Sequence, residues 1–425
     1  MKLEVANYNV EDVRWAEKSY FADSCLYLSK RELKDIILED ELLEDVELVL
    51  TKPGENTRIV NILDMFDARC KASDEGTIYP GFTNDIGTPG IGRTNVLTGF
   101  SIAEIGKVEN LQAFTEIFLG VLDMNGPGAE VTEYSKNHVL SLVFSCKTKN
   151  AESMAMVHKR ACTKISEYIA KTTINKKPNE IKVYEMNPCK RGEKKLPRVG
   201  YIYYTESQNH LKETYFYGIN SHYFVPFTMH PNEVMDGAMV CMMYEYSAGH
   251  RDHTISMCNN PVVQELYSKH GKEIEFGGMI VCNAHLKHTL KKSVAYLAAK
   301  IAKYNLELDA VVITKEGGGH PVTDLMLCGE ECEKAGLKTA LITEEVLNPD
   351  GTGMSTVFYS PHVDLVVSTG NHEELVDIPQ MENLVGYEKD HPKYLEMIGP
   401  RKIRSGVIPG ALQITGHTKL GCKAF

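Results

Sequence analysis

Residues 310–342 read Ala-Val-Val-Ile-Thr-Lys-Glu-Gly-Gly-Gly-His-Pro-Val-Thr-Asp-Leu-Met-Leu-Cys-Gly-Glu-Glu-Cys-Glu-Lys-Ala-Gly-Leu-Lys-Thr-Ala-Leu-Ile. Two short apolar runs, at 310–313 and 339–342, flank a glycine-rich turn and an amphipathic segment at 321–335. Short apolar runs bounded by turn residues indicate buried strands, and apolar residues at a spacing of three or four indicate a helix. The stretch therefore predicts a strand, a turn, a helix and a second, parallel strand.

The same alternation extends to both sides of this unit. Further strands are predicted at 199–205, 223–228, 277–282 and 363–368, and further helices at 208–216, 261–270 and 289–304. Strands that are apolar throughout are typical of parallel sheets with both faces covered by helices. We therefore expect an α/β fold in which residues 195–425 form a Rossmann-like substrate domain, built on a doubly wound, mostly parallel sheet.

The first part of the chain follows another pattern. Short strands and turn clusters dominate, and a hairpin is predicted over 46–51 and 58–63. A polar stretch at 172–197 marks a domain boundary. Residues 1–180 are therefore expected to form a mixed, β-rich N-terminal domain.

The composition of the 425 residues is that of an ordinary globular protein, with 43% hydrophobic and 24% charged residues. The net charge of −11 argues against nucleic acid as the main partner. No apolar run approaches the length of a membrane span, and the N-terminus lacks a signal-peptide core. The 11 cysteines are odd in number and scattered, which argues against a disulfide framework. These features predict a cytoplasmic protein that contacts neither membrane nor nucleic acid.

The glycine turn is the first candidate site. Gly317, Gly318 and Gly319 follow a predicted strand and lead through His320 into the next helix. Glycines let a ligand approach the backbone closely, and free amides at a helix start attract anions, so a phosphate or a substrate carboxylate fits here. A tight connection without a ligand explains the spacing equally well, and His320 fits a hydrogen-bonding role as well as a catalytic one. Ligand sites in such sheets lie at the carboxyl ends of the strands.

The second candidate is the connection at 230–260, which contains Cys241, Cys258, His250 and His253. Long connections tend to be functional or disordered, and the apolar residues of this one favour function. Histidine and cysteine are metal-ligand types, but no strict ligand spacing is met, so a solvated loop is favoured over a metal site.

Several segments together resemble a known family. They read Gly-Ile-Gly-Arg-Thr-Asn-Val-Leu-Thr-Gly at 90–99, Met-Asn-Gly-Pro-Gly-Ala at 124–129, Pro-Asn-Glu-Val-Met-Asp-Gly-Ala at 231–238, Asn-Asn-Pro-Val-Val-Gln-Glu-Leu-Tyr-Ser-Lys-His-Gly at 259–271, Glu-Gly-Gly-Gly-His-Pro-Val-Thr-Asp-Leu at 316–325 and Gln-Ile-Thr-Gly at 413–416. Spread nearly end to end, they are similar to the precursor of the alpha and beta subunits of component B of the glycine, sarcosine and betaine reductase complexes of amino-acid-fermenting anaerobes.

The resemblance implies an oxidoreductase subunit that binds a small amine whose carbon–nitrogen bond the complex cleaves reductively. It implies an oligomeric assembly with a selenocysteine-containing component B subunit, and electrons delivered through the component A selenoprotein. The expected substrate-binding residues are Asp236 and Tyr244 in the central connection, the glycine turn with His320, and Asp324 in the following helix. The alternative is a non-catalytic binding or scaffold subunit of the same complex.

The resemblance also implies self-cleavage at an internal cysteine to form a pyruvoyl group, whose ketone would condense with the substrate amine. The family's Asn-Cys junction is replaced here by Met-Met-Tyr at 242–244, and the nearby cysteine is Cys241, the expected catalytic residue. Branched Val240 hinders attack on its own carbonyl, so an unprocessed chain is favoured. An unprocessed chain suits a quaternary amine, held against the aromatic face of Tyr244, although Tyr244 also fits a plain packing role.

Overall fold

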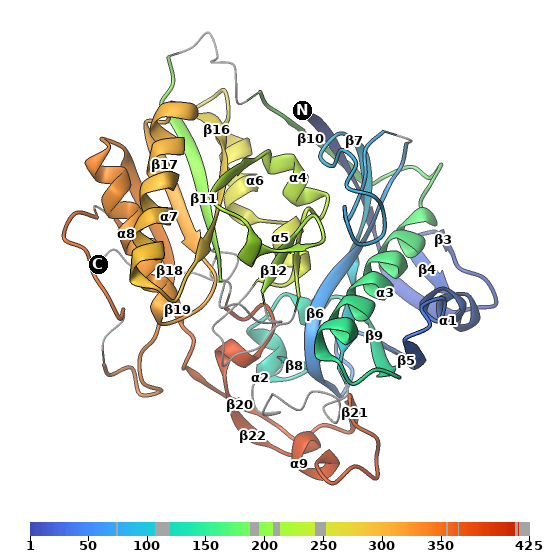
Figure 1. Cartoon of the computed structure of the whole chain (residues 1–425). Helices are drawn as coiled ribbons and strands as arrows, with labels where there is room; N and C mark the ends of the chain where they lie inside the picture. Colours follow the sequence, from blue (N-terminus) through green and yellow to red (C-terminus); the bar gives the residue numbers. More distant parts are fainter. Residues whose placement is uncertain are drawn as a thin grey trace.

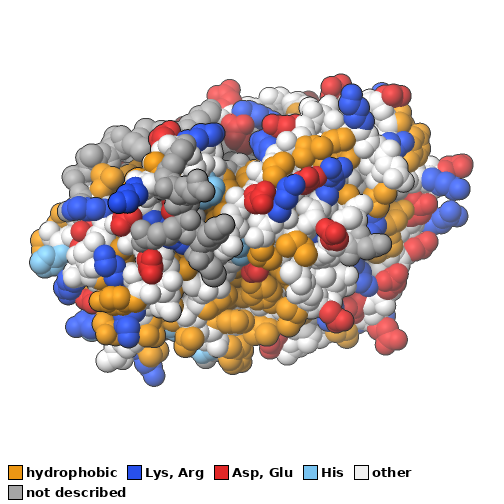
Figure 2. All heavy atoms as spheres, turned by 90° about the horizontal axis from the view of Figure 1, so that it is seen from above, with side chains coloured by type: hydrophobic (Ala, Val, Ile, Leu, Met, Phe, Trp, Pro, Cys, Tyr) orange, Lys and Arg blue, Asp and Glu red, His pale blue; other side chains and the backbone are white. Residues whose placement is uncertain are grey.

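The computed structural model describes residues 1–73, 75–106, 120–187, 195–206, 213–242, 252–353, 356–363, 365–412 and 415. Two large sheets lie side by side, each with helices against it (Figure 1). The predicted α/β class, with a mostly parallel sheet in the C-terminal half, is confirmed. Figure 2 shows basic and acidic side chains interspersed over one face of the molecule. In the described part of the chain, no helix has both the length and the apolar character that crossing a membrane requires.

The first sheet has eight strands and a mixed topology. Its strands are β1 (Lys2–Asn9), β5 (Leu43–Thr51), β6 (Thr57–Lys71), β7 (Gly92–Ile105), β8 (Gly120–Asp123), β9 (His138–Cys146), β10 (Glu180–Glu185) and β21 (Asn383–Val385). Helix α3 (Ala151–Lys171) covers β6 and β7, and its apolar side chains fill the core beneath it. A small sheet of β2 (Asp12–Trp15), β3 (Tyr20–Ala22) and β4 (Cys25–Leu28), followed by α1 (Lys30–Ile37), completes this half.

The second sheet has the order β14-β16-β11-β17-β18-β19. These strands are β11 (Arg198–Glu206), β14 (Phe227–Met229), β16 (Glu275–Ala284), β17 (Ala310–Lys315), β18 (Lys338–Glu345) and β19 (Val366–Asn371). All neighbours run parallel except β14, an antiparallel edge strand.

Helices cover both faces of this sheet, as alternate residues of β11 show. Ile202 and Tyr204 belong to the core beneath α7 (His288–Lys300) and α8 (His320–Lys334). Tyr201 and Tyr203 belong to the core beneath α6 (Pro261–Lys269) on the opposite face. Side chains of a strand alternate between faces, so fully buried strands read as continuous apolar runs. This is why the strands of this sheet are visible in the sequence.

The strand order creates a switch point between β11 and β17. From β11 the chain moves to β16 on one side, and then returns across β11 to β17 on the other. At such a point the connections leave in opposite directions, and ligand sites of α/β sheets lie beyond the carboxyl ends of the two strands. The glycine turn follows β17, so the fold places it at this switch point.

The central connection is not the loop that the sequence predicts. It contains α4 (Pro231–Met235), β15 (Met239–Cys241) and α5 (Thr254–Cys258), and β15 pairs with β12 (Thr214–Phe216), which in turn pairs with β13 (Ile219–Asn220). Val240 lies in the core of the first sheet, whereas Met239 and Cys241 lie in that of the second. Buried on both sides, the segment joins the two halves of the molecule.

Two further predictions need correction. The helix predicted at 208–216 is contradicted at residues 214–216, which form β12, while 208–212 lie outside the described residues. The hairpin over 46–51 and 58–63 is wrong, because β5 pairs with β9 and β6 pairs with β7 and β8. Pairing between distant strands leaves no local signal in the sequence.

The C-terminal region returns to the first sheet. Strand β21 pairs with β6, and the buried guanidinium of Arg58 donates to Asp123 and to the carbonyls of Pro379, Met397 and Gly399. The remaining elements of this region are β20 (Leu375–Ile378), α9 (Tyr394–Ile398) and β22 (Arg401–Arg404). Strand β10, which follows the predicted end of the N-terminal domain at residue 180, also belongs to the first sheet, because it pairs with β1. Residues assigned from sequence to one substrate domain therefore contribute to both halves.

Candidate functional site

Buried carboxylates gather at the carboxyl ends of three neighbouring strands. Glu206 ends β11, Glu316 directly follows β17, and Glu344 lies near the end of β18, and all three are fully buried. The amide of Glu206 donates to Glu316 Oε2 at 3.2 Å. Burying a charge is costly unless it is paired or hydrogen-bonded, so such a cluster marks a specialised region of the fold.

One buried lysine offsets part of this negative charge. Lys315 Nζ donates to both oxygens of Glu344, at 2.6 and 2.7 Å, and to the carbonyl of Gly317 at 2.5 Å. Lys315 is fully buried, so these bonds replace the water that the ammonium loses. The pair holds the glycine turn against β18.

The glycine turn is shaped by close contacts on one side and open on the other. Gly317 has φ +79°, and a Cβ there would lie 2.9 Å from Glu206 Cδ. A Cβ at Gly318 would lie 3.5 Å from Glu344 Oε1, and Gly319 has open space around it. Gly318, Gly319 and His320 are partly exposed, whereas Gly317 is buried. Solvent therefore reaches the glycine turn and the first residue of α8, which lie beside the buried carboxylates.

His320 connects the turn to a second ion pair. Lys291 Nζ, from α7, donates to His320 Nδ1 at 3.1 Å and forms a buried pair with Asp324. Burial, with the charges of Lys291 and Lys315, lowers the pKa of His320 to about 4. The neutral ring accepts from Lys291 at Nδ1, so Nε2 carries the proton and faces Glu206 Oε1 at 3.9 Å. Burial raises the pKa of Asp324 to about 6, against the opposing effect of Lys291.

Asp252 adds another carboxyl group to this region. Burial raises its pKa to about 7, and the charges of Glu316 and Glu344 act in the same direction. Tyr203 donates its hydroxyl to Asp252 Oδ2 at 3.2 Å. Tyr244, predicted to bind substrate, lies outside the described residues.

The structure connects Cys241 to the glycine turn through Thr214 and Glu316. Cys241 is opposite Thr214 in the β12–β15 ladder, and Thr214 Oγ1 donates to Glu316 at 2.8 and 3.0 Å. Cys241 is fully buried, and its amide donates to Thr254 Oγ1 at 3.1 Å. One strand pair and one side-chain hydrogen bond thus connect Cys241 to the residue preceding the turn.

A buried charge network lies behind Cys241 and was missed from the sequence. Thr254 donates its hydroxyl and its amide to Asp64, at 2.5 and 2.8 Å. Lys159 Nζ, from α3, donates to Asp64 at 2.8 Å and to Glu104 at 2.5 Å. Burial disfavours the charged lysine, but the two carboxylates outweigh burial and raise its pKa. Burial raises the pKa of Asp64 to about 6 despite Lys159. The sequence does not single these residues out, because β6, β7 and α3 each contain other charged residues.

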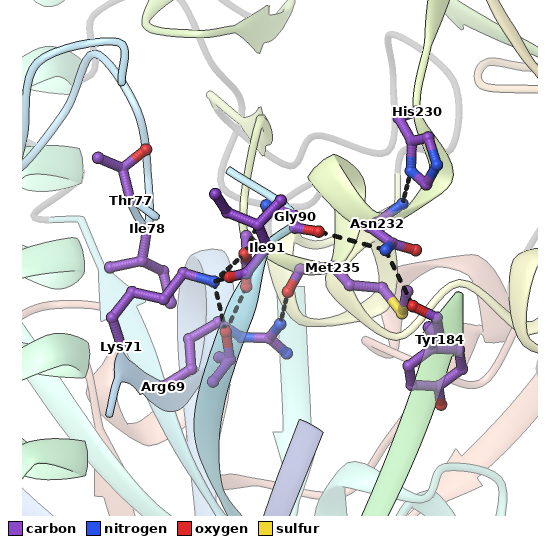
Figure 3. A network of polar contacts seen from close by, with 12 residues as sticks. Arg69, Lys71, Thr77, Ile78, Gly90, Ile91, Tyr184, His230, Asn232 and Met235 are labelled. Atoms are coloured by element: carbon purple, nitrogen blue, oxygen red, sulfur yellow. Dashed lines mark hydrogen bonds and ion pairs between the residues drawn. The ribbon is translucent and has the colours of Figure 1, made fainter. Parts of the chain in front are cut away.

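Asp236 is bound by residues of the N-terminal half of the chain, not by the glycine turn. Its carboxylate accepts from Lys71, from Thr94 Oγ1 at 2.6 Å and from the amide of Gly90 at 2.7 Å. Figure 3 shows the surrounding contacts, in which Asn232 donates to the carbonyls of Gly90 and Tyr184, and Arg69 donates to Met235. The fully buried Asp236 therefore fastens the end of α4 to β6 and β7, and we leave it out of the proposed site.

In the ranges that the structure describes, no three His, Cys, Asp or Glu side chains are gathered as a metal ion would need. His250 lies outside these ranges. A hollow of about 650 Å³ lies away from the switch point, on the first sheet beside Arg93 and Lys176. The carboxylate-lined glycine turn is therefore the candidate for which fold and chemistry agree.

The fold and this edge define an α/β protein with a candidate small-molecule site at the switch point of a parallel sheet. Comparison with known proteins then gives the family: the chain belongs to the glycine/sarcosine/betaine reductase component B subunits, whose family model matches residues 1–399.

Three relatives illustrate this membership. The sarcosine reductase complex component B subunit alpha of Peptoclostridium acidaminophilum is 33% identical over 393 residues, covering 91% of this chain and 89% of the relative. The glycine reductase complex component B subunits alpha and beta of Acetoanaerobium sticklandii are 32% identical over 441 residues, covering 100% of both. The betaine reductase complex component B subunit alpha of Peptoclostridium acidaminophilum is 32% identical over 398 residues, covering 91% and 88%. No solved structure matches the chain.

Proposed function

We propose that this chain is the substrate-binding subunit of a reductase complex that cleaves the carbon–nitrogen bond of glycine, sarcosine, betaine or a related amine. Family membership and the names of the relatives support this role. The observation that carries the proposal is the set of buried carboxylates around the glycine turn, where Glu206, Glu316 and Glu344 approach the start of α8.

This arrangement favours a small zwitterion over an inorganic anion. Near the glycine turn, the described residues include the buried carboxyl groups of Glu206, Glu316, Glu344, Asp252 and Asp324. Two buried lysines lie among them, with Lys315 paired to Glu344 and Lys291 paired to Asp324. Such surroundings attract a cationic nitrogen and repel a phosphate or a nucleotide. The amides at the start of α8 suit a single carboxylate. An amino acid or a betaine carries both groups within a few bonds of each other.

The chemistry divides between this chain and its partners. Reductive cleavage needs a nucleophile and two electrons, which we assign to a selenocysteine-containing component B subunit and to the component A selenoprotein. The family resemblance supports this division. This chain would then bind and orient the amine at the sheet edge, and exclude water from the buried carboxylates.

Cys241 decides between two forms of the subunit. Val240 and Cys241 lie in the β12–β15 ladder, and branched Val240 shields its own carbonyl, which favours an intact chain. The amide of Cys241, whose nitrogen self-cleavage would release, donates to Thr254 Oγ1 at 3.1 Å in the intact chain. A pyruvoyl group at Cys241 would supply a ketone that condenses with a primary or secondary amine. A quaternary amine cannot condense in this way, so an intact chain suits a betaine-like substrate.

Two measurements test these statements. Intact-mass spectrometry of the purified chain separates one full-length species from two fragments that meet between Val240 and Cys241. Isothermal titration calorimetry with glycine, sarcosine and betaine tests the site itself. We expect Glu206→Gln to weaken binding at least tenfold and Glu265→Gln, on the exposed face of α6, to leave it unchanged. Equal binding by both variants, or binding of none of the three compounds, would contradict the proposed site.

A further inference from the structure

In the half of the molecule built on the first sheet, a cysteine contacts a histidine, which in turn contacts a glutamate. Cys146, at the end of β9, has its Sγ 3.2 Å from His158 Nε2, on α3. His158 Nδ1 lies 3.2 Å from Glu104 Oε1, on β7. A nucleophile within hydrogen-bond reach of a base, which is oriented by a third group, is the arrangement that activates cysteine and serine nucleophiles.

The carboxylate of Glu104 orients the imidazole of His158. Burial alone would raise the pKa of Glu104, but Lys159 and His158 outweigh burial and lower it, so the carboxylate is ionised. An ionised carboxylate accepts the proton of Nδ1, which leaves Nε2 as an acceptor facing the thiol of Cys146. The ring of Phe144 stacks on His158, with centroids 4.4 Å apart and planes 21° apart, and holds this orientation.

Cys146 also differs from the other described cysteines in its exposure. Of the nine cysteines in the described ranges, eight are buried and Cys146 is partly exposed. We therefore expect an electrophile from solvent to reach this thiol without unfolding of the chain.

We propose that Cys146, His158 and Glu104 form a nucleophilic thiol site that exchanges with disulfides. Cys146 Sγ attacks one sulfur of the disulfide while its proton moves to His158 Nε2. The sulfur–sulfur bond breaks, and the leaving thiolate takes the proton back from His158. The products are a mixed disulfide on Cys146 and one free thiol, so no oxidant other than the disulfide is consumed.

The site needs its base because the thiol is a weak acid here. Burial, together with the charges of Glu104 and Asp40, raises the pKa of Cys146 to about 11. Little thiolate therefore exists at neutral pH, and attack depends on proton transfer to His158. Arg160, paired with Asp40 at 2.8 Å, offsets part of the negative charge. The dependence of attack on His158 distinguishes the site from a thiol that reacts only because it is exposed.

The test follows the reaction of the native chain with an aromatic disulfide, 5,5′-dithiobis(2-nitrobenzoate), at neutral pH. Cys189 and Cys422 lie outside the described residues, so the measurements use a Cys189→Ser, Cys422→Ser background. We expect one fast-reacting thiol, located at Cys146 by peptide mass spectrometry and abolished by Cys146→Ser. His158→Gln should slow the reaction about 100-fold, the lower end of general-base effects. His138→Gln, at a histidine elsewhere on β9, serves as the matched control and should leave the rate unchanged.

Unfolding cannot imitate this result, because unfolding exposes thiols and speeds their reaction. In denaturant, the His158→Gln and parent chains should react at equal rates. A fast thiol that persists in Cys146→Ser, or a native His158→Gln chain that reacts at the parent rate, would overturn the proposal.

Discussion

The hydroxyl of Thr214 donates to both oxygens of Glu316, at 2.8 and 3.0 Å, from a strand that belongs to a different sheet. Both residues are fully buried. Through this contact the small sheet that contains Cys241 is connected to the carboxyl edge of the large parallel sheet. The candidate site is therefore assembled from two parts of the chain that are about 100 residues apart.

Removing this hydroxyl should destabilise the fold. Thr214→Val keeps the shape of the side chain but leaves the buried carboxylate of Glu316 with one donor fewer. Such a loss costs about 1–3 kcal/mol, and more when the partner is charged. Urea denaturation measures the change, and Thr228→Val, at an exposed position of β14, is the control that should stay within about 0.5 kcal/mol of the parent. Equal stability of the two variants would show that Thr214 does not support Glu316.

The buried lysine of α3 should matter far more than an exposed one. Lys159→Met leaves Asp64 and Glu104 as uncompensated buried carboxylates, and breaking a buried pair in this way costs about 3–5 kcal/mol. Lys164→Met, on the same helix, removes an exposed pair with Glu39 and should cost at most about 1 kcal/mol. Thermal unfolding of the two variants gives the comparison. A small loss of stability in Lys159→Met would mean that water reaches the network and solvates the two carboxylates.

The large parallel sheet was predictable because its strands are buried on both faces. The run at 310–313 and the strand β17 agree in position, as do the run at 277–282 and β16. The central connection was not predictable, because β15 and α5 are only three and five residues long and their apolar residues belong to three different cores. Elements of this length are fixed by tertiary packing, which leaves no periodicity to detect.

The site was visible only in part. Glycines between a strand and a helix indicated the turn, and the fold places it at the switch point. Glu206, Lys315 and Glu344 were missed because a charged residue at the end of an apolar run reads as the start of a loop. Their common position at strand ends is a signal that could have been used, since buried charges at such ends point to a site.

The glycine turn should tolerate a methyl group at one position and not at another. Gly317→Ala combines a left-handed φ with a Cβ 2.9 Å from Glu206 Cδ and 2.8 Å from Pro321 Cγ. Gly319→Ala has a similar φ of +70° but open space, so it isolates the backbone strain, about 1–3 kcal/mol. We expect Gly317→Ala to be the less stable variant and to lose amine binding by calorimetry. If both variants bound alike, the close approach of Gly317 to Glu206 would be irrelevant to the site.

Asp252 should make stability fall as the pH rises toward neutrality. Its pKa in the folded chain is about 7, against an ordinary value of 3.8. Between these values the folded chain holds a proton that the unfolded chain releases, so the contribution is complete below about pH 4 and is lost as the pH rises through 7. At 1.36 kcal/mol per pKa unit, the upper bound of the effect is about 4 kcal/mol. Asp252→Asn imitates the protonated carboxyl group and should flatten this part of the curve of unfolding free energy against pH. Asp35→Asn, at an exposed position of α1, should reproduce the parent curve, and a parent-like slope in Asp252→Asn would assign the titration to other groups.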